Sequence, residues 1–412
     1  MLDYWFTFRS AIKRHRDGLL GPYVDAFATR LREEGYARGT AQYQIQLISA
    51  FGRWLSRRGL KICSLHDEII EKYLRYRWRR GQWVSGDRAP LMRLLRQLQS
   101  DGLVPARRPA AVESHLDLIG NAYREYLDKD RQLERCTQAY YIPYVHSFLS
   151  ERYGTTKPRL AQLTANDVIR FIQRHVHDCC RGRAKHMVTA LRSFFRFLRL
   201  RGDIRVDLAA CVPTIPDWRM TGLPQALQSH EVKKLLNTCD RSTGVGRRNY
   251  AILLLLARLG LRAGGVVNLT FEDIDWEAGE IKVSGKNRRP NLLPLPDDVG
   301  RALANYLRRG RPRCSTRRVF VRAKAPYAGF VNSRAITTIV SRAIKRAGLN
   351  PPHRGAHLLR HTLATHLLRR GALLSEIGEV LGHRDPDTTS IYAKVDLARL
   401  RTLVCRWPGG AR

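Results

Sequence analysis

Apolar residues recur at spacings of three and four along the first half of the chain, the pattern of helices that each bury one face. Four such runs are followed, after an offset of roughly 100 residues, by four similar runs, and self-similarity of this kind indicates one fold used twice. The pattern therefore predicts two small helical bundles. Their runs are residues 23–34, 40–58, 65–80 and 89–99 in the first bundle and residues 119–130, 137–152, 163–180 and 184–200 in the second.

Large aromatic residues lie within these runs at helical spacing and share a face with aliphatic residues. A shared face indicates that the aromatic rings belong to the core, because a ring that stacks on nucleic-acid bases must be exposed. We therefore expect the two stripes to be buried. They comprise Phe51, Trp54 and Leu55 in the first bundle and Leu191, Phe194, Phe195 and Leu198 in the second.

The pattern changes from about residue 223 onward. Ser229 is expected to cap a helix, and an apolar run over residues 247–260 predicts a buried helix that ends at Gly260. Alternating residues over 280–283 and 291–295 predict two strands joined by a turn, followed by a basic connector. Further helices are expected over residues 333–347, around 357–361, over 375–381 and in the last twenty residues, with Tyr392 opening or preceding the last one.

Proline-rich stretches separate these three blocks. One covers residues 105–111, and the other covers residues 212–224 and contains Pro213, Pro216 and Pro224. The predicted architecture is therefore mainly α with a small β-hairpin, an α+β fold. Its expected parts are two helical bundles, at residues 1–105 and 112–212, and a third domain at residues 223–412.

The charge of the chain narrows the choice of partner. Lys and Arg number 73 against 36 Asp and Glu, so the formal net charge is +37, and the basic residues are spread along the whole chain. Such a charge favours double-stranded DNA as partner and salt-dependent binding. No apolar stretch approaches the roughly 20 residues that a membrane-spanning helix needs. Without a secretory signal at the N-terminus, we expect a cytoplasmic protein associated with the nucleoid.

The eight cysteines have no paired spacing and no C-x-x-C motif, so we expect buried, unpaired thiols. A cluster of His175, His177, Cys179 and Cys180 is the one candidate for a metal site. On a helix these side chains spread over more than one face, and no second ligand pair lies at zinc-finger spacing. We therefore expect neither a metal nor another cofactor.

Arginine and lysine residues flank the predicted stripes, with few acidic residues to pair with them. A solvated helix face normally interleaves Glu with Lys, so the shortage of acidic residues favours DNA contact, mostly with phosphates. In the second bundle the candidates for DNA binding are Arg181, Arg183, Lys185, Arg192 and Arg196. The first bundle has a comparable run at Arg75, Arg77, Arg79 and Arg80, and the sequence leaves open whether this bundle binds DNA or another subunit.

The third block contains a set of polar residues that suits phosphodiester chemistry. Arginine forks bind non-bridging phosphate oxygens, a lysine can protonate a leaving alkoxide, and a tyrosine can act as nucleophile. His357 and Arg360 lie three apart and so share a helical face, whereas His361 and His366 are expected off that face. The candidate catalytic residues are Arg262, Lys286, His357, Arg360, His383 and Tyr392.

The order and spacing of these residues resemble the catalytic domain of the tyrosine recombinase (phage-type integrase) family. The resemblance rests on Leu261-Arg262, Gly285-Lys286, the segment HLLRHTLATHLL at residues 357–368, Leu381-Gly382-His383 and Tyr392. The resemblance extends over the third block, from about residue 223 onward. Residues 119–203 resemble, more weakly, the family's helical core-binding (SAM-like) domain, and the first bundle looks like an extra copy of it.

The resemblance implies a metal-free transesterification. Arg262 and Arg360 would bind the scissile phosphate, and His357 and His383 would hydrogen-bond it or help to move the tyrosine proton. Lys286 would protonate the leaving 5′ oxygen, while Tyr392 would attack to give a 3′-phosphotyrosine, whose retained bond energy permits rejoining without ATP. The resemblance also implies a tetramer of subunits on DNA, which integrates, excises or transposes a mobile element.

One position departs from the family. Many members have an acidic residue three places after the first arginine, where this chain has Gly265, so Arg262 would be less well braced and cleavage slower. Two alternative functions remain open at this point. One is a type IB topoisomerase, which shares the chemistry, and the other is a DNA-binding accessory protein with weak catalysis.

Overall fold

The computed structural model describes residues 1–105, 114–154, 156–216, 225–284, 290–382 and 386–392. It contains two compact units, one formed by Met1–Ala106 and Met220–Arg412 and the other by Arg107–Arg219. Helices dominate both, and the described strands form a single three-stranded sheet. Among the described helices, none combines the length and the apolar character needed to cross a membrane.

The first helical region buries one continuous core between helices that the sequence pattern predicts. Phe51 and Leu55 are fully buried in this core and Trp54 nearly so, which confirms the first stripe. Two short helices precede the predicted ones. The elements are α1 (Leu2–Trp5), α2 (Arg9–Arg16), α3 (Gly21–Glu33), α4 (Arg38–Arg57), the 3₁₀-helix η1 (Ile62–Ser64), α5 (Asp67–Arg79) and α6 (Arg88–Ser100).

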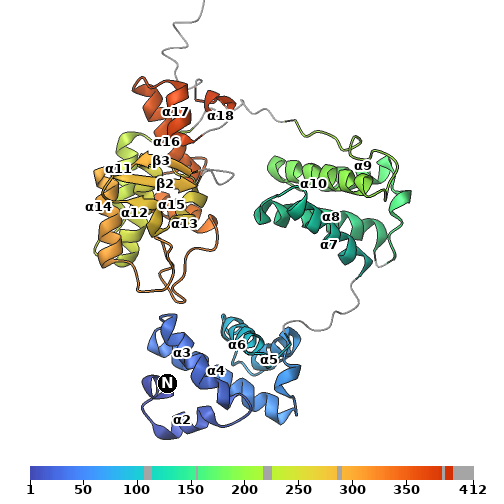
Figure 1. Ribbon diagram of the computed structural model, residues 1–412, viewed down its shortest axis with the longest axis vertical. Helices are drawn as coiled ribbons and strands as arrows, with labels where there is room; N and C mark the ends of the chain where they lie inside the picture. The colour runs from blue at the N-terminus through green and yellow to red at the C-terminus, as the bar shows by residue number, and fades with distance from the viewer. Residues whose placement is uncertain (106–113, 155, 217–224, 285–289, 383–385, 393–412) are drawn as a thin grey trace, which may run out of the picture. The chain divides into compact units, whose positions relative to one another are not determined.

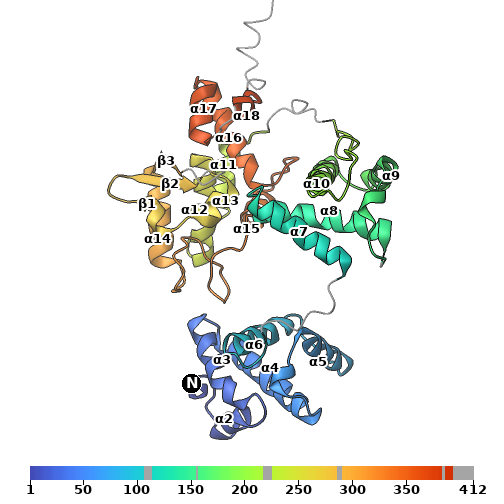
Figure 2. The same ribbon diagram turned by 45° about the vertical axis from the view of Figure 1, so that its right-hand side comes forward.

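The second helical region repeats the order of α3 to α6, including the 3₁₀-helix between its second and third helices (Figures 1 and 2). Ser114 and Thr164 begin two of its helices with reciprocal capping boxes, each closed by an aspartate three residues later. Its predicted stripe is fully buried. The elements are α7 (His115–Lys129), α8 (Arg135–Tyr153), η2 (Leu160–Gln162), α9 (Ala165–Val176) and α10 (Arg181–Leu200).

The C-terminal region packs helices around a short antiparallel sheet of order β1-β2-β3. In the predicted hairpin, Val283 lies opposite Asn291 and Glu280 opposite Pro294. The elements before the sheet are α11 (Ser229–Asn237), α12 (Gly244–Leu259), α13 (Ala263–Asn268) and η3 (Phe271–Asp273). The sheet and the following helices are β1 (Ile274–Asp275), β2 (Glu280–Ser284), β3 (Pro290–Pro294), α14 (Asp297–Arg309), α15 (Arg334–Arg346), α16 (Ala356–Arg369), α17 (Leu374–Leu381) and α18 (Pro386–Ser390).

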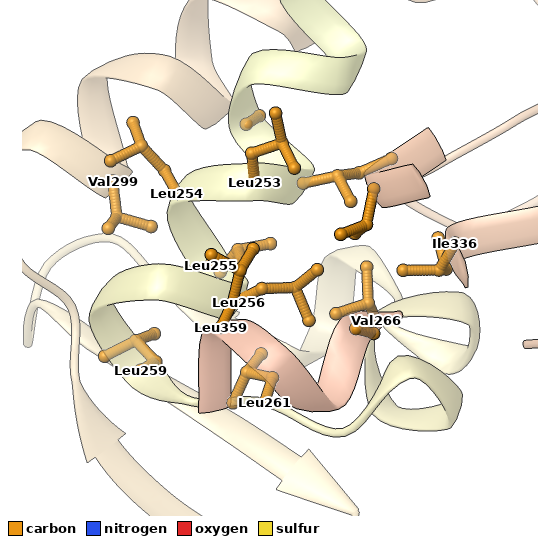
Figure 3. Packing of buried hydrophobic residues seen from close by; sticks show 14 of the residues in the cluster. Leu253, Leu254, Leu255, Leu256, Leu259, Leu261, Val266, Val299, Ile336 and Leu359 are labelled. Carbon is orange, nitrogen blue, oxygen red and sulfur yellow. The ribbon is translucent and has the colours of Figure 1, made fainter. Parts of the chain in front are cut away.

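Helix α12 is the centre of this core, because its apolar residues lie on every side of the helix. Residues 252–256 are buried together, and Figure 3 shows their neighbours Val299, Ile336 and Leu359, which come from α14, α15 and α16. Full burial of a leucine side chain stabilises a fold by about 1.5–3 kcal/mol. The end of α12 is therefore held rigidly, and the residues that follow it are positioned by the core.

Several details differ from the sequence-based expectations. Helix α14 lies where a basic connector was expected, because Val299, Ala302, Leu303 and Tyr306 give it a buried face. Gln228, and not Ser229, caps α11, and its N–H donates to the carboxylate of Glu231. The strand β1 and the helix α18 were not expected, and both are short.

The expectation of buried cysteines is wrong for most of those described. Cys239 is buried, whereas Cys63 and Cys180 are exposed and Cys179, Cys211 and Cys314 are partly exposed, all as free thiols. Within the candidate metal cluster, His175 pairs instead with Glu151 at 2.9 Å between its Nε2 and a carboxylate oxygen. That contact occupies Nε2 of the histidine with a carboxylate of the neighbouring helix α8.

Candidate active site

Arg262 is placed by the abrupt end of α12. Gly260 ends that helix in the left-handed conformation, with φ of +59°, and a Cβ atom there would lie 2.7 Å from the Leu381 side chain. Leu261 returns to the core, and Arg262 begins α13. Its guanidinium donates a hydrogen bond from Nη2 to the Gly382 carbonyl at 3.2 Å, so it lies beside the end of α17.

Arg360 projects from α16 into the space between the ends of α12 and α17. It is only 5% exposed. Its Nη1 donates to the Gly260 carbonyl at 2.6 Å, and its Nη2 donates to the Leu381 carbonyl. Carbonyls at the C-terminal ends of helices lack partners within the helix and carry partial negative charge. Arg360 thus joins two helix ends and fixes its own charge beside that of Arg262.

The cationic groups in this region influence one another. Burial, followed by the charge of Arg262, lowers the pKa of Arg360 to about 10. Burial and then the charges of Arg360 and Arg262 lower the pKa of His357, so these three side chains lie close together as expected. Among the described carboxylates, none pairs with Arg262 or Arg360. Two guanidinium charges this close together, without a described carboxylate partner, are suited to bind an anion.

Tyr392 follows α18 and is buried in a small apolar cluster with Ala364, Leu368, Ile377 and Leu381. It is only 1% exposed. Burial raises the pKa of its phenol to about 12, and the charge of Arg360 offsets part of this shift. The phenol is therefore neutral at physiological pH.

His361 holds the Tyr392 hydroxyl in this buried position. Its Nδ1 lies 2.8 Å from the Tyr392 oxygen. Burial, and then the charges of His357 and Arg360, lower the pKa of His361, so its imidazole is also neutral near pH 7. With the imidazole proton on Nε2, the phenol donates its proton to Nδ1. The sequence-based exclusion of His361 from the site is therefore wrong.

The helical spacing could have included His361. Residues 357 and 361 lie four apart and thus share a face of α16, with ring centroids 6.4 Å apart. Both Arg360, three residues after His357, and His361, four residues after it, lie on this side of the helix, so the spacing predicts a shared face for all three. The exclusion of His366 agrees with its contact, because its Nε2 lies 3.1 Å from the Leu227 carbonyl, away from Tyr392.

Two expected site residues, Lys286 and His383, lie outside the described residues, as does the expected helix in the last twenty residues. The described chain gives only their connections. Lys286 belongs to the segment that joins β2 to β3, and His383 directly follows Gly382, which ends α17 and accepts the hydrogen bond from Arg262.

The five basic residues expected to bind DNA all lie on α10, in the other unit. Arg181, Arg183 and Arg196 are exposed, and Lys185 and Arg192 are partly buried. Arg192 donates to the carbonyls of Val212 and Pro213, so its guanidinium braces the chain that follows the bundle. The exposed arginines are the ones whose charge remains accessible to a phosphate.

Comparison with known proteins agrees with this arrangement. A model of the phage integrase family matches residues 225–399, which include every candidate catalytic residue. The chain is 44% identical to a putative integrase/recombinase, y4rA, from Sinorhizobium fredii, and the match covers all of both chains. It is also 31% identical to the tyrosine recombinase XerC of Oceanobacillus iheyensis, covering 70% of this chain and 95% of that protein.

Among solved structures, the fold is similar to that of the XerH site-specific recombinase bound to a palindromic difH substrate, in a post-cleavage complex. The TM-score is 0.55 at 20% sequence identity, and the match covers 71% of this chain and 95% of that one. The structural likeness shows the fold, and the sequence relatives show the lineage. The chain belongs to the phage integrase family of tyrosine recombinases, the enzymes of site-specific recombination that cut and rejoin DNA strands.

Proposed function

We propose that this protein cuts DNA by attack of the Tyr392 hydroxyl on a phosphodiester held by Arg262 and Arg360. A bond forms between the tyrosine oxygen and phosphorus as the bond from phosphorus to the 5′ oxygen breaks, which leaves a 3′-phosphotyrosine and a free 5′ hydroxyl. The observation that carries the proposal is a pair of guanidiniums, one buried and one partly buried, that pair with no described carboxylate and lie beside a buried phenol. Such donors stabilise negative charge that develops on the phosphate oxygens.

The remaining candidates complete the proton transfers. His357 lies close enough to both arginines for their charges to lower its pKa, which supports its assignment to hydrogen-bond the same phosphate. We assign Lys286 to protonate the departing 5′ oxygen, and His383, with His357, to bind the phosphate and accept the proton of the attacking phenol. In the reverse step a 5′ hydroxyl attacks the phosphotyrosine and loses its proton to Lys286, while the departing Tyr392 oxygen regains its proton from a histidine.

Tyr392 must change its surroundings before it reacts. Its hydroxyl is engaged by His361 and its ring lies in an apolar cluster, where ionisation is unfavourable. We propose that DNA binding draws Tyr392 toward the arginine pair, where positive charge lowers the cost of removing its proton. The buried arrangement is then the resting state of the nucleophile.

Binding of the duplex is assigned mainly to the bundle at residues 112–212. Its α10 presents Arg181, Arg183 and Arg196 to solvent, and such side chains position a protein on DNA through phosphates and carry little sequence information. We propose that this bundle and the catalytic domain at residues 223–412 each bind the duplex. The related XerH was solved on a palindromic site, and two subunits on each of two sites give the tetramer that we propose here.

The decisive experiment uses a nicked suicide duplex taken from the ends of the genetic element that encodes the protein. Wild type is expected to form a covalent protein–DNA band on a denaturing gel, and Tyr392→Phe is expected to form none. Tyr250→Phe, which alters a half-buried tyrosine on α12, is the matched control and should behave as wild type.

The outcomes separate the possible functions. Binding without a covalent band for wild type would contradict the proposal and favour a DNA-binding accessory role. Relaxation of supercoiled plasmids that lack the element's ends, at an undiminished rate, would favour a type IB topoisomerase. Cleavage confined to the element's ends would support an integrase of a mobile element.

A further inference from the structure

We propose that the first helical region, residues 1–105, contains a second DNA-binding site, a hollow that receives a backbone phosphate of the duplex. The hollow has a volume of about 390 Å³ and lies between α2, α4 and α5. Its polar lining includes Arg14, His15, Tyr43, Gln46, Arg53 and Arg77, and its lining contains no carboxylate. The DNA substrate is taken from the proposed function, whereas the site is separate from the catalytic residues.

Two of the three arginines are available to a ligand. Arg14 and Arg53 are exposed, and neither forms an ion pair with a described residue. Both lie close enough to His15 for their charges to lower its pKa, although burial is the larger cause. The two residues thus line the same hollow from different helices, α2 and α4. Mutual repulsion among these cations is relieved when an anion enters the hollow.

The third arginine is fixed in place by a buried carboxylate. Asp87 has a fully buried side chain, and it accepts from Arg77 Nε at 3.1 Å and from the Tyr43 hydroxyl at 2.6 Å. It also accepts from the Val84 N–H, which holds the loop between α5 and α6. Arg77 is therefore preorganised as one wall of the hollow, and its charge is partly compensated by Asp87.

His15 lines the hollow with a buried imidazole, and only one of its two ring nitrogens forms a hydrogen bond to a described residue. It is only 7% exposed, and its Nδ1 lies 2.9 Å from the Ser49 hydroxyl oxygen. Because the Ser49 hydroxyl donates to the Ile45 carbonyl, it accepts from His15, which places the imidazole proton on Nδ1. Nε2 has no hydrogen-bond partner among the described residues. On protonation it becomes a donor for a phosphate oxygen.

A phosphodiester of duplex DNA fits these features better than an acidic protein surface does. The chain itself has 36 acidic residues against 73 basic ones, so another subunit offers few carboxylates. The loop fixed by Asp87 also presents Trp83, which is 49% exposed, beside the hollow's Arg77 wall. An exposed aromatic next to guanidiniums is common where proteins contact nucleic acids.

The test compares full-length proteins that all carry Tyr392→Phe, so that cleavage does not interfere. Binding to a labelled duplex is measured by fluorescence anisotropy at several salt concentrations. Arg14→Ala with Arg53→Ala is expected to weaken binding and to reduce the slope of log affinity against log salt by about 1, the change for one phosphate that is no longer neutralised. The matched control, Arg58→Ala with Lys61→Ala, removes two exposed cations that do not line the hollow and should keep the original slope.

A second measurement locates the DNA directly. A photoreactive benzoylphenylalanine in place of Gln46, an exposed residue of the hollow, should crosslink to the labelled duplex, whereas the same group in place of Glu33 should not. An unchanged salt slope together with no crosslink at position 46 would overturn the inference. Crosslinking of position 46 to another subunit would overturn it in favour of a protein interface.

These outcomes are distinguishable from failure of the proposed function. If the parent protein binds the duplex and forms the covalent intermediate when Tyr392 is restored, the proposed function stands whatever the hollow does. If the parent protein does not bind DNA at all, both proposals fall. The proposed phosphate site is tested separately, by comparing the salt slopes of the two double variants.

Discussion

A single hydrogen bond connects the proposed nucleophile to the helix that carries its phosphate-binding arginine. His361 accepts a hydrogen bond from the Tyr392 hydroxyl, and Arg360 directly precedes His361 on α16. Both partners are neutral in this state, because burial raises the pKa of the phenol and lowers that of the imidazole. The contact therefore stabilises the resting position of Tyr392 and opposes its ionisation there.

Replacing His361 with Ala should expose Tyr392 more often. Removing the hydrogen-bond partner of a buried hydroxyl destabilises the folded structure by about 1–3 kcal/mol. Here the destabilised arrangement is the resting state, in which Tyr392 is buried. We expect nitration of Tyr392 by tetranitromethane, followed by peptide mass spectrometry, to proceed roughly tenfold faster than in wild type, since 1.4 kcal/mol is a factor of ten. His366→Ala, on the same helix but bonded to Leu227, is the control. Equal nitration rates in wild type and His361→Ala would show that the bond does not retain Tyr392.

Gly265 offers a second test at the scale of one residue. A glutamate there should brace Arg262, whose pKa is lowered by burial without a compensating carboxylate. The new Cβ atom would lie 3.2 Å from the Val283 side chain, so a small shift of that side chain is required. We expect Gly265→Glu to raise the single-turnover cleavage rate by roughly tenfold, the lower end of effects from residues that orient a functional group.

Gly264→Glu provides the matched control for this change. It adds the same charge one residue earlier on α13, where a Cβ atom meets open space. An increase in cleavage with both variants would indicate a general effect of negative charge. An unchanged rate with Gly265→Glu would remove the proposed brace.

At the scale of elements, the site is assembled where the ends of two helices meet the side of a third. α12 ends at Gly260, α17 ends at Gly382, and Arg360 of α16 donates to carbonyls at both ends. Glycine is needed at both ends because φ is positive there. A change in one helix end therefore moves both arginines relative to each other.

Gly260→Ala should disturb this junction more than a simple backbone penalty predicts. The left-handed conformation alone costs an alanine about 1–2 kcal/mol, and the added Cβ atom would also lie 2.7 Å from Leu381. Gly279→Ala is the matched control, because its φ is +66° and its Cβ atom meets open space. Urea denaturation should show a larger loss of stability for Gly260→Ala, and equal losses would mean that Leu381 adjusts without cost.

Most elements of the catalytic region could be predicted from the sequence, because their signals are local. Gly260 and Gly382 end their helices as expected, and the alternation in β2 and β3 gives the hairpin. Helix α14 was missed although Val299 and Tyr306 have helical spacing, since its many charged residues outweighed that pattern. β1 has two residues and is defined only by its pairing with β2, which no local signal reveals.

The site itself was predictable as a set of residue types but not as a geometry. The order of Arg262, His357, Arg360 and Tyr392 matches the tyrosine recombinase family. The motifs of that family reflect which residues meet during the reaction. The contact of Tyr392 with His361 belongs to the resting state, and it depends on how α18 places a tyrosine against α16. Such a tertiary contact cannot be read from spacing along the chain.

At the scale of the whole molecule, histidines that are wholly or partly removed from solvent link stability to pH. Burial lowers the pKa of His15 in the first helical region and of His357 and His361 in the catalytic region below the ordinary value of 6.5. The unfolded chain therefore binds protons at a higher pH than the folded chain. Stability is fully present above pH 6.5 and is lost as pH falls from there through the lower folded pKa values.

This linkage predicts a lower urea midpoint at pH 5.5 than at pH 7.5. Carboxylates contribute little over this interval, because their pKa values lie well below it. The variant His357→Gln with His361→Gln should lose less of its stability between the two pH values than wild type does. Equal midpoints for wild type at both pH values would show that these imidazoles protonate without penalty in the folded protein.

The burial of Tyr392 also affects how often the protein can cleave host DNA that is not its target. A protein with a formal charge of +37 spends much of its time on DNA that is not its target, and every such encounter brings a phosphate near its arginines. Tyr392, the proposed nucleophile, is 1% exposed in the resting structure, so on the proposed mechanism these encounters lack the group that breaks the strand. Accidental nicking of the chromosome is thereby limited to the fraction of time that Tyr392 spends outside its apolar cluster.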